Sequence, residues 1–432
     1  MSVQRSATTR RRLGASLVGA ALVVGAAAGC GGGAASGAAE EVKVGLIFPT
    51  TGGQAALGTD QNNAAKMVLE WANAHGGVGG KKIKIFEGDS QSNPGVGATV
   101  AQRMIDQNGV QVIIGSYASG IAQAIAPVAQ RNRVLLWEVG AVAPNVAQPG
   151  NKYFLRTVGA SETYAAADID FLENYLAGKL GKPLDQIRVA VTHEDGPFGT
   201  SVADAIVAQA KAKNITIVAR EAYPENSTDV TPVVVRLKAA QPDVLLAVPL
   251  VASTPLLWQA ARTQDFNVKA VIGSAGFSSS SFLDKFGAKG IEGVYDVEAP
   301  AVENMNSANL KPEAKEVLDK LRADFRAKVG HDCLVHCGDG LGGAYILVKD
   351  VLPRAVQSGK VTGDSIRQAA EKTDIPDGGT PQGFGAKFND KGDNERAKSY
   401  IMQWQGGKLQ VVYPQSLAAA EPIFPMPTWG QR

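Results

Sequence analysis

The stretch Val42-Lys-Val-Gly-Leu-Ile-Phe48 is followed by Pro49-Thr-Thr-Gly-Gly-Gln54 and then by apolar residues with helical spacing from Asp60 to His75. A short apolar run that ends at a glycine-containing turn is typical of a buried β-strand, whereas apolar residues three to four positions apart are typical of a helix. This order of strand, turn and helix recurs along the chain. The opening stretch therefore predicts the first βαβ unit of a parallel sheet.

The recurring pattern predicts two sheets rather than one. Strand-like runs are expected at 42–48, 82–86, 112–114 and 134–139, and the pattern restarts at 187–192, 215–220, 244–248 and 269–272. A mainly helical stretch follows from Pro312 to Lys372, before two last strands at 399–405 and 409–413. Because strands alternating with helices build parallel sheets covered on both faces, the predicted fold class is α/β with two doubly wound, Rossmann-like lobes.

The first thirty residues predict export. Arginines at positions 5 and 10–12 precede an uncharged run from Leu13 to Ala28, which is typical of a signal peptide and too short and weakly apolar for a permanent span. Ala27-Ala-Gly-Cys30 resembles a bacterial lipobox, although Ala27 stands where leucine is usual, and this implies acylation of the Cys30 thiol. We interpret residues 1–29 as a lipoprotein signal peptide and residues 30–41, mostly Gly, Ala and Ser, as a flexible tether.

Charge and motifs argue against nucleic-acid binding and catalysis. Removal of residues 1–29 takes away four of the 43 basic residues and none of the 41 acidic ones, so the remaining chain has no electrostatic reason to bind nucleic acid. No G-x-S-x-G elbow, Walker loop or H-E-x-x-H is present, and the glycine run at 76–80 follows a helix, the reverse of a dinucleotide loop. We expect neither an enzyme nor a cofactor.

Several segments carry a resemblance to one family. Lys43 to Gly58 and Ala74-His-Gly-Gly-Val-Gly-Gly-Lys81 resemble the opening of the branched-chain amino-acid-binding family, the type I periplasmic binding proteins of ABC importers. The resemblance continues in family order as far as Tyr413, at 89–94, 112–119, 154–157, 198–199 and 388–393. It implies a venus-flytrap protein in which two lobes close on a ligand, with hinge crossings near 156–160, 299–302 and 380–384.

The resemblance also implies a domain plan and a function. Lobe I would comprise 42–156 and 300–382, lobe II would comprise 157–299 and 383–413, and the proline-rich end 414–432 would be a strap or tail. We expect a monomeric, extracytoplasmic protein held to the cell membrane by its lipid, which binds an amino acid or a related small solute and delivers it to an ABC permease and its ATPase. The alternative is a ligand-sensing extracellular domain of the same fold without a transport role.

In this family, the turn after the third strand binds the carboxylate of the ligand. Here that turn contains Tyr117, Ala118 and Ser119, and the resemblance assigns the hydroxyl contact to Ser119. The free N–H groups at the start of the following helix also favour an anion, although Ser119 alternatively only caps that helix. After the fourth strand, Gly140 and Val142 match positions whose backbone holds an amino-acid head group, but Val142 replaces a threonine.

The second lobe departs from the family pattern. Ala275 occupies the position of the acidic residue that binds the ligand's ammonium, and a buried unpaired ammonium is costly, so the sequence disfavours an ordinary α-amino acid. Glu138 is a candidate for the missing charge; alternatively it lies at a strand end in water or pairs with an arginine. Aromatic side chains that could line the cleft and favour an aromatic, amide or heteroaromatic solute, or else pack in the lobes, are Tyr117, Trp137, Phe198 and Phe277.

Two clusters have alternative interpretations. Cys333 and Cys337 lie with His331 and His336 in an H-x-C-x2-H-C pattern. The pattern has enough ligands for zinc, but outside the cell we expect a disulfide instead, or free thiols, and no metal. The run His193-Glu194-Asp195 resembles a catalytic group, yet it lies where this family has a cleft loop, so we expect a ligand contact or a structural role.

Overall fold

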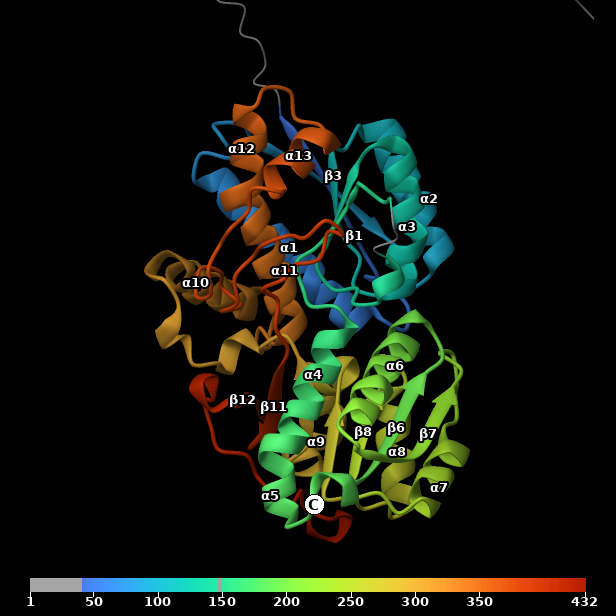
Figure 1. Cartoon of the computed structure of the whole chain (residues 1–432). Coiled ribbons are helices and arrows are strands. Elements are labelled where there is room, and N and C mark those ends of the chain that lie inside the picture. The colour runs from blue at the N-terminus through green and yellow to red at the C-terminus, as the bar shows by residue number, and fades with distance from the viewer. Residues whose placement is uncertain (1–40, 147–149) are drawn as a thin grey trace, which may run out of the picture. The chain divides into compact units, whose positions relative to one another are not determined.

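Two β-sheets, each covered by helices on both faces, organise the computed structural model, which describes residues 41–146 and 150–432 (Figure 1). Both sheets belong to one compact unit. The expected signal peptide, Cys30 and nearly all of the tether lie outside the described residues. Within the described residues, no helix is long and apolar enough to cross a membrane.

The first sheet has five parallel strands in the order β2-β1-β3-β4-β5. About half of its residues are Val, Ile or Leu, and β1, β3, β4 and β5 are almost completely buried, as expected for a sheet covered on both faces. The strands are β1 (Val42–Phe48), β2 (Ile83–Asp89), β3 (Val112–Gly115), β4 (Leu135–Glu138) and β5 (Phe154–Arg156).

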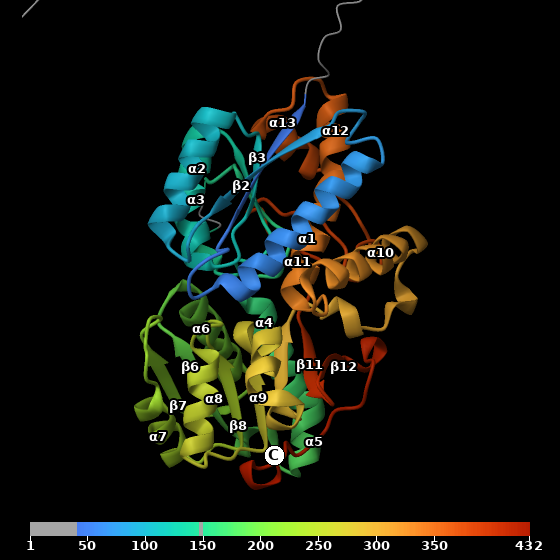
Figure 2. The ribbon, with the colours of Figure 1, turned by 180° about the vertical axis from the view of Figure 1, so that it is seen from behind.

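Helices from two distant parts of the chain cover the first sheet. Figures 1 and 2 show α2 and α3 on one face, and α1 beside α11 on the other, with α12 and α13 nearby. The side chain of Asn93 caps α2 by accepting the Val96 N–H at 3.1 Å. The helices are α1 (Ala55–Ala74), α2 (Pro94–Arg103), α3 (Ser119–Asn132), α10 (Pro312–Val329), α11 (Val335–Ile346), α12 (Leu352–Gln357) and α13 (Gly363–Ala370).

The second sheet has seven strands in the order β12-β11-β10-β9-β8-β6-β7. The five strands from β6 to β10 are parallel, and β11 and β12 add an antiparallel edge. The strands are β6 (Arg188–Glu194), β7 (Thr216–Tyr223), β8 (Val244–Val248), β9 (Ala270–Gly273), β10 (Tyr295–Glu298), β11 (Tyr400–Gln405) and β12 (Lys408–Tyr413).

Separate apolar clusters occupy the two faces of the second sheet. One face packs against α4 (Ser161–Phe171) and α6 (Pro197–Ala212), with the short α5 (Ala177–Leu180) following α4. The other face packs against α7 (Thr231–Ala239), α8 (Thr254–Thr263) and α9 (Ser280–Ile291). Each lobe therefore has its own hydrophobic core.

The chain passes between the two sheets three times: after β5, after β10 and between α13 and β11. These passages and the two helix-covered sheets confirm the predicted fold class. All ten expected strands are present, with ends shifted by up to three residues. Two strands and two long helices were not expected from the sequence. They are β5, which has only three residues, β10, whose inward side chains are acidic, and α4 and α9.

The C-terminal segment 414–432 packs along lobe II as a strap. The Tyr295 hydroxyl donates to the carbonyl of Ile423 at 2.8 Å, and the indole N–H of Trp429 donates to the carbonyl of Phe266 at 2.8 Å. The guanidinium of Arg432 lies 4.9 Å from the ring centre of Trp258 and 5.0 Å from that of Trp429. The strap is therefore tied to the lobe almost to its last residue.

Candidate ligand-binding site

The carboxyl ends of strands from both sheets face a shared, narrow cavity, whose volume is about 10 Å³. In open parallel sheets, this edge is where ligands bind, because loops and helix N-termini converge there. The strands β3, β4, β8, β9 and β10 lead into it, together with α4, α6 and α11. The lining residues are Tyr117, Ala118, Ser119, Gly140, Tyr164, Phe198, Leu250, Ala275, Glu298 and His336.

Ser119 is the first residue of α3 and is almost completely buried. Its hydroxyl oxygen accepts the N–H of Ala143 at 3.1 Å and makes no capping bond to α3. The alternative that Ser119 only caps its helix is therefore wrong. Since the oxygen accepts from the protein, the hydroxyl hydrogen can point to a ligand, beside the first N–H groups of α3, which have no partner within the helix.

Two lining residues have left-handed backbone conformations that side chains other than glycine rarely adopt. The φ angle is 73° at Tyr117 and 51° at Ala275. The Tyr117 hydroxyl is buried and, among the described residues, has no hydrogen-bond partner. Strained backbone tends to occur at functional sites, where the surrounding structure holds it in place. A buried hydroxyl without a partner beside the cavity suits contact with a polar ligand group.

Glu138 organises the first wall of the cavity without lining it. One carboxylate oxygen accepts the N–H groups of Ser116, Gly140 and Ala141 at 2.7 to 2.9 Å, and the other accepts the Ser116 hydroxyl at 3.0 Å. Burial raises the pKa of Glu138, although these donors counteract the rise. The carboxylate therefore joins the loops after β3 and β4, instead of lying at a strand end in water or pairing with an arginine.

Glycine is required at position 140 by close packing. A Cβ atom there would lie 2.6 Å from Nε2 of Gln61 and 2.8 Å from Cα of Tyr117. Non-bonded heavy atoms pack at about 3.5 to 4.0 Å, so any other residue would push the two loops apart. Gly140 thus allows the β4 loop to lie against the β3 turn beside the cavity.

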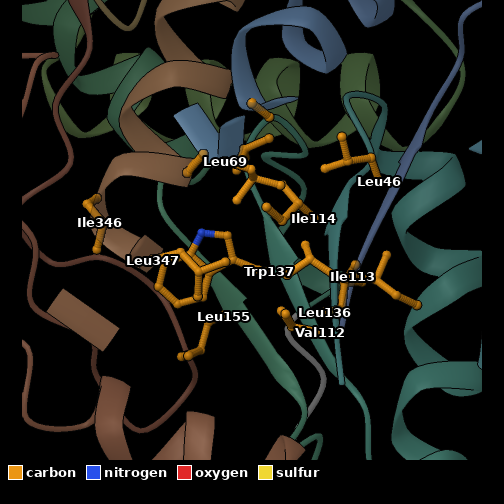
Figure 3. Packing of buried hydrophobic residues seen from close by; sticks show 14 of the residues in the cluster. Leu46, Leu69, Val112, Ile113, Ile114, Leu136, Trp137, Leu155, Ile346 and Leu347 are labelled. Atoms are coloured by element: carbon orange, nitrogen blue, oxygen red, sulfur yellow. The ribbon is translucent and has the colours of Figure 1, made fainter. Parts of the chain in front are cut away.

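Four sequence-predicted site residues do not line the cavity: Glu138, which therefore does not supply the missing charge, and Trp137, Phe277 and Val142. Trp137 is fully buried in the lobe I core, where Figure 3 shows it near Leu155 and Leu347, and its indole N–H donates to the carbonyl of Gly343 at 2.9 Å. Phe277 is fully buried in the lobe II core against Trp258. Val142 packs in the cluster that contains α4 and α6. Tyr117, Ala118, Ser119, Gly140, Phe198 and Ala275 do line the cavity.

Glu298 and His336 bring titratable groups to the cavity from opposite lobes. Nε2 of His336 lies 3.4 Å from a Glu298 oxygen, and Nδ1 lies 3.7 Å from an oxygen of Asp339. Burial alone would lower the pKa of His336, but the Glu298 and Asp339 carboxylates raise it above its ordinary value. Burial raises the pKa of Asp339 to about 8, although His336 lowers it, and the side-chain amide of Gln382 donates to Asp339 at 2.7 Å.

Two further carboxyl groups are buried near Glu298. Asp296 lies two residues before it on β10, and Asp168 lies on α4. Both are almost completely buried, and neither carboxyl is fully hydrogen-bonded within the described residues. Burial raises the pKa of both groups well above the ordinary value, and Glu298 raises that of Asp296 further. Within the part of the chain that the structure describes, neither Asp296 nor Asp168 lies in a salt bridge, so this end of lobe II is rich in uncompensated acids.

We expect Asp296→Asn to stabilise the protein increasingly as the pH rises. The raised pKa of Asp296 means that the folded state binds the proton more tightly, so stability falls above the unfolded-state pKa until the folded-state pKa is reached. Because asparagine does not titrate, it removes this loss of stability, which amounts to as much as about 1.4 kcal/mol per pH unit. Urea unfolding at pH 5, 6 and 7 measures this pH-dependent gain in stability, with the exposed Asp390→Asn as a control. A difference between Asp296→Asn and wild type that does not change with pH would contradict the expectation.

The cysteine and histidine cluster does not converge on a metal position. The structure contains a disulfide between Cys333 and Cys337, while His331 lies 3.3 Å from Asp60 and His336 faces Glu298. In residues 41–146 and 150–432, no group of three or more His, Cys, Asp or Glu side chains is arranged to hold a metal ion. The zinc interpretation therefore has no support in the geometry.

The run His193-Glu194-Asp195 has structural contacts. The Glu194 carboxylate accepts the N–H groups of Gly196 and Gly199 at the start of α6. Asp195 accepts the N–H of Glu225 at 2.9 Å, and Nε2 of His193 accepts a hydrogen bond from Arg220 at 3.2 Å. These contacts fix the β6–α6 turn, which positions Phe198 at the cavity.

Sequence reasoning missed four lining residues: Tyr164, Leu250, Glu298 and His336. His336 was noticed only as a possible zinc ligand. The alternation of Asp296 and Glu298 in a short, otherwise apolar run was the available signal for a strand with inward acids. Tyr164 lies on α4, whose apolar residues show almost no preference for one face, so no helical pattern revealed it.

The two helix-covered sheets, three connecting passages and the cavity between strand ends define a two-lobed, type I solute-binding protein. The chain belongs to the periplasmic binding protein family, whose model matches residues 41–408. The Leu/Ile/Val-binding protein homolog 8 of Brucella abortus is 31% identical over 96% of this chain and 99% of its own length. Homolog 7 of Brucella suis is 30% identical over 90% of this chain and 95% of its own. These matches confirm the resemblance to the branched-chain amino-acid-binding proteins.

Solved structures share the fold. The branched-chain amino acid transporter substrate-binding protein LivJ of Streptococcus pneumoniae, in complex with isoleucine, has a TM-score of 0.72 and 18% identity, over 89% of this chain and all of its own. A solute-binding protein from R. palustris in complex with benzoate has a TM-score of 0.70 and 16% identity, over 89% of this chain and 98% of its own. The fold thus occurs with chemically different ligands.

Proposed function

We propose that this chain is the substrate-binding protein of an ABC importer, which closes on an amino acid or a related small solute and delivers it to a permease. The observation that carries the proposal is the cavity at the facing strand ends. Both lobes line this cavity, and the chain passes between the lobes three times. The cavity lining combines apolar side chains with a few polar groups, which is typical of sites for small solutes. The names of the relatives support a transport role.

A ligand screen tests this proposal. The protein should unfold at a higher temperature with a solute that binds only the folded state. The panel would contain the proteinogenic amino acids, simple amides and ureas, benzoate and other aromatic acids. Mass spectrometry of solute carried through purification provides an independent readout. If no member of the panel raises the unfolding temperature, the proposed ligand class is wrong.

The proposed carboxylate position depends on Ser119. We expect Ser119→Ala to weaken binding of a carboxylate solute by about 1 to 3 kcal/mol, because the hydroxyl donor is lost. Loss of the acceptor for the Ala143 N–H should also lower the free energy of unfolding of the unliganded protein. Calorimetric titration with the best solute of the screen measures the first effect, and urea unfolding the second. Unchanged affinity would remove Ser119 from the site.

Anchoring by lipid at Cys30 is part of the proposal. It rests on the basic start, the short apolar run and Ala27-Ala-Gly-Cys30. Cys30→Ser should abolish labelling by a fatty-acid analogue and release the protein from membranes. Labelling that persists in Cys30→Ser would refute acylation at this residue.

The competing function is ligand sensing by the same fold without transport. Genes for an ABC permease and an ATPase next to the gene for this chain would favour import. Solute uptake that is unaffected by deletion of this gene would favour sensing.

A further inference from the structure

Glu298 lies on the lobe II wall of the cavity, next to the residue that lacks the acid expected there. Ala275 follows β9 and Glu298 ends β10, and these two strands are parallel neighbours in the sheet. Glu298 is almost completely buried, and one of its oxygens accepts the Ser278 hydroxyl at 2.6 Å. The other oxygen faces His336 across the lobes. A carboxylate thus lies on the same wall as Ala275, supplied by the adjacent strand.

The surroundings of Glu298 lack a permanent cation. None of the ten cavity-lining residues is a lysine or arginine, and Asp296 and Asp168 add buried acids behind Glu298. The only lining group that can become positive is the His336 imidazole. Since a buried carboxylate without a cation is costly, either protonated His336 or a cationic ligand group must balance it.

His336 is held loosely for a buried imidazole. Within the described residues, neither ring nitrogen has a hydrogen-bond partner of good geometry. The charged or titratable groups that face it are Glu298 from β10, Asp339 from its own helix α11, Asp60 from α1 and Tyr117 from the β3 turn, whose ring lies edge-on at 5.1 Å. The proton on His336 is therefore held by the nearby Glu298 and Asp339 carboxylates rather than by fixed hydrogen bonds.

We propose that Glu298 binds the cationic amino group of the solute and that His336 releases its proton when the solute binds. The inference rests on the proposed function and specifies its ligand class as a zwitterionic amino acid. The carboxylate would lie at Ser119 and the start of α3, and the ammonium at Glu298. An ammonium at Glu298 would lie beside protonated His336, and the repulsion between these neighbouring cations favours release of the His336 proton to the buffer. No covalent bond forms or breaks, apart from the N–H bond of the imidazolium.

Matched pairs of solutes test the role of Glu298. The probes are L-leucine, L-isoleucine, L-phenylalanine and L-glutamine, each paired with the acid that lacks the amino group: 4-methylpentanoate, 3-methylpentanoate, 3-phenylpropanoate and 4-carbamoylbutanoate. The wild type should bind at least one amino acid more tightly than its partner. Glu298→Gln should lower the affinity for that amino acid about 100-fold and change the affinity for its partner much less. Glutamine can keep the Ser278 bond, and circular dichroism checks folding.

Glu225→Gln is the control, because Glu225 is an exposed acid of lobe II that contacts lobe I. It accepts a hydrogen bond from Gln54 at 3.1 Å but does not line the cavity. This variant should keep wild-type preferences. If the amino-free acids bind the wild type as tightly as the amino acids do, the inference is wrong. It is also wrong if Glu298→Gln changes the affinity for neither class of solute. In both cases the proposed binding function stands. If none of the eight probes binds and the wider ligand screen also fails, the proposed function fails with it.

Calorimetry in two buffers tests proton release. At pH 6, binding of the preferred amino acid should release about one proton, seen as a difference in heat between phosphate and Bis-Tris buffers, and the release should disappear at high pH. His336→Asn should abolish it, whereas His75→Asn, which changes an exposed histidine, should not. Equal heats in both buffers for the wild type, or unchanged release in His336→Asn, would overturn the proton exchange.

Discussion

Replacing Glu138 with leucine should lower the free energy of unfolding by about 5 kcal/mol and abolish solute binding. The substitution leaves the N–H groups of Ser116, Gly140 and Ala141 without their acceptor in a buried place. Each unsatisfied buried donor costs about 1 to 3 kcal/mol. Because these donors lie in the two loops that form the lobe I wall, the cavity should lose its shape together with the stability. Urea unfolding and calorimetric titration measure the two losses.

Glu138→Gln separates hydrogen bonding from charge. Its amide oxygen can accept the same N–H groups, and its NH₂ group can donate to the Ser116 hydroxyl oxygen. Since burial raises the pKa of Glu138, a neutral side chain suits this position, and we expect a loss of no more than about 1 kcal/mol. A glutamine variant as unstable as the leucine variant would mean that the negative charge itself is required.

Replacing Arg156 with methionine should cost about 3 to 5 kcal/mol of unfolding free energy, because it breaks a buried ion pair on one side. The Arg156 guanidinium is fully buried and donates to the carbonyls of Ala141 and Ala143 at 3.1 and 3.0 Å, and to Asp393. It therefore connects the first passage between the lobes, the loop that contacts Ser119, and the segment before β11. Solute affinity should fall as well.

Arg133→Met is the matched control for this prediction. Arg133 also pairs with an aspartate, Asp364, at 2.5 Å, but its side chain is 68% exposed. Exposed ion pairs contribute little, so this variant should change the free energy of unfolding far less than Arg156→Met does. Similar losses for Arg156→Met and Arg133→Met, measured by urea unfolding, would contradict the distinction between buried and exposed pairs.

Local patterns were sufficient for most of the fold. The apolar runs at β1, β3 and β8 are strands because Val, Ile and Leu fill both faces of a covered sheet, and Asn93 with Pro94 marks the start of α2. Site residues could be predicted from the sequence where a turn follows a strand, as at Ser119, Gly140 and Ala275. In these cases sequence neighbours determine both the element and the position at the cavity.

The remaining site depends on contacts between distant parts of the chain. Trp137 was expected near the ligand because it precedes a ligand loop, but strand alternation turns its side chain into the core, where Gly343 accepts its N–H. Glu298 and His336 are 38 positions apart in sequence and belong to different lobes. Only the packing of α11 against lobe I and of β10 in the second sheet brings them together. No local pattern contains that information.

The strap has a practical consequence for how the protein can be labelled or immobilised. Arg432 lies against Trp258 and Trp429, so a purification tag or fluorescent fusion inserted next to it would begin inside a packed surface. Displacement of the strap would also uncover Val411 on the edge strand β12, whose carbonyl accepts the N–H of Ala419. Unpaired edge strands promote self-association. An attachment point in an exposed loop is preferable for sensors or surface capture.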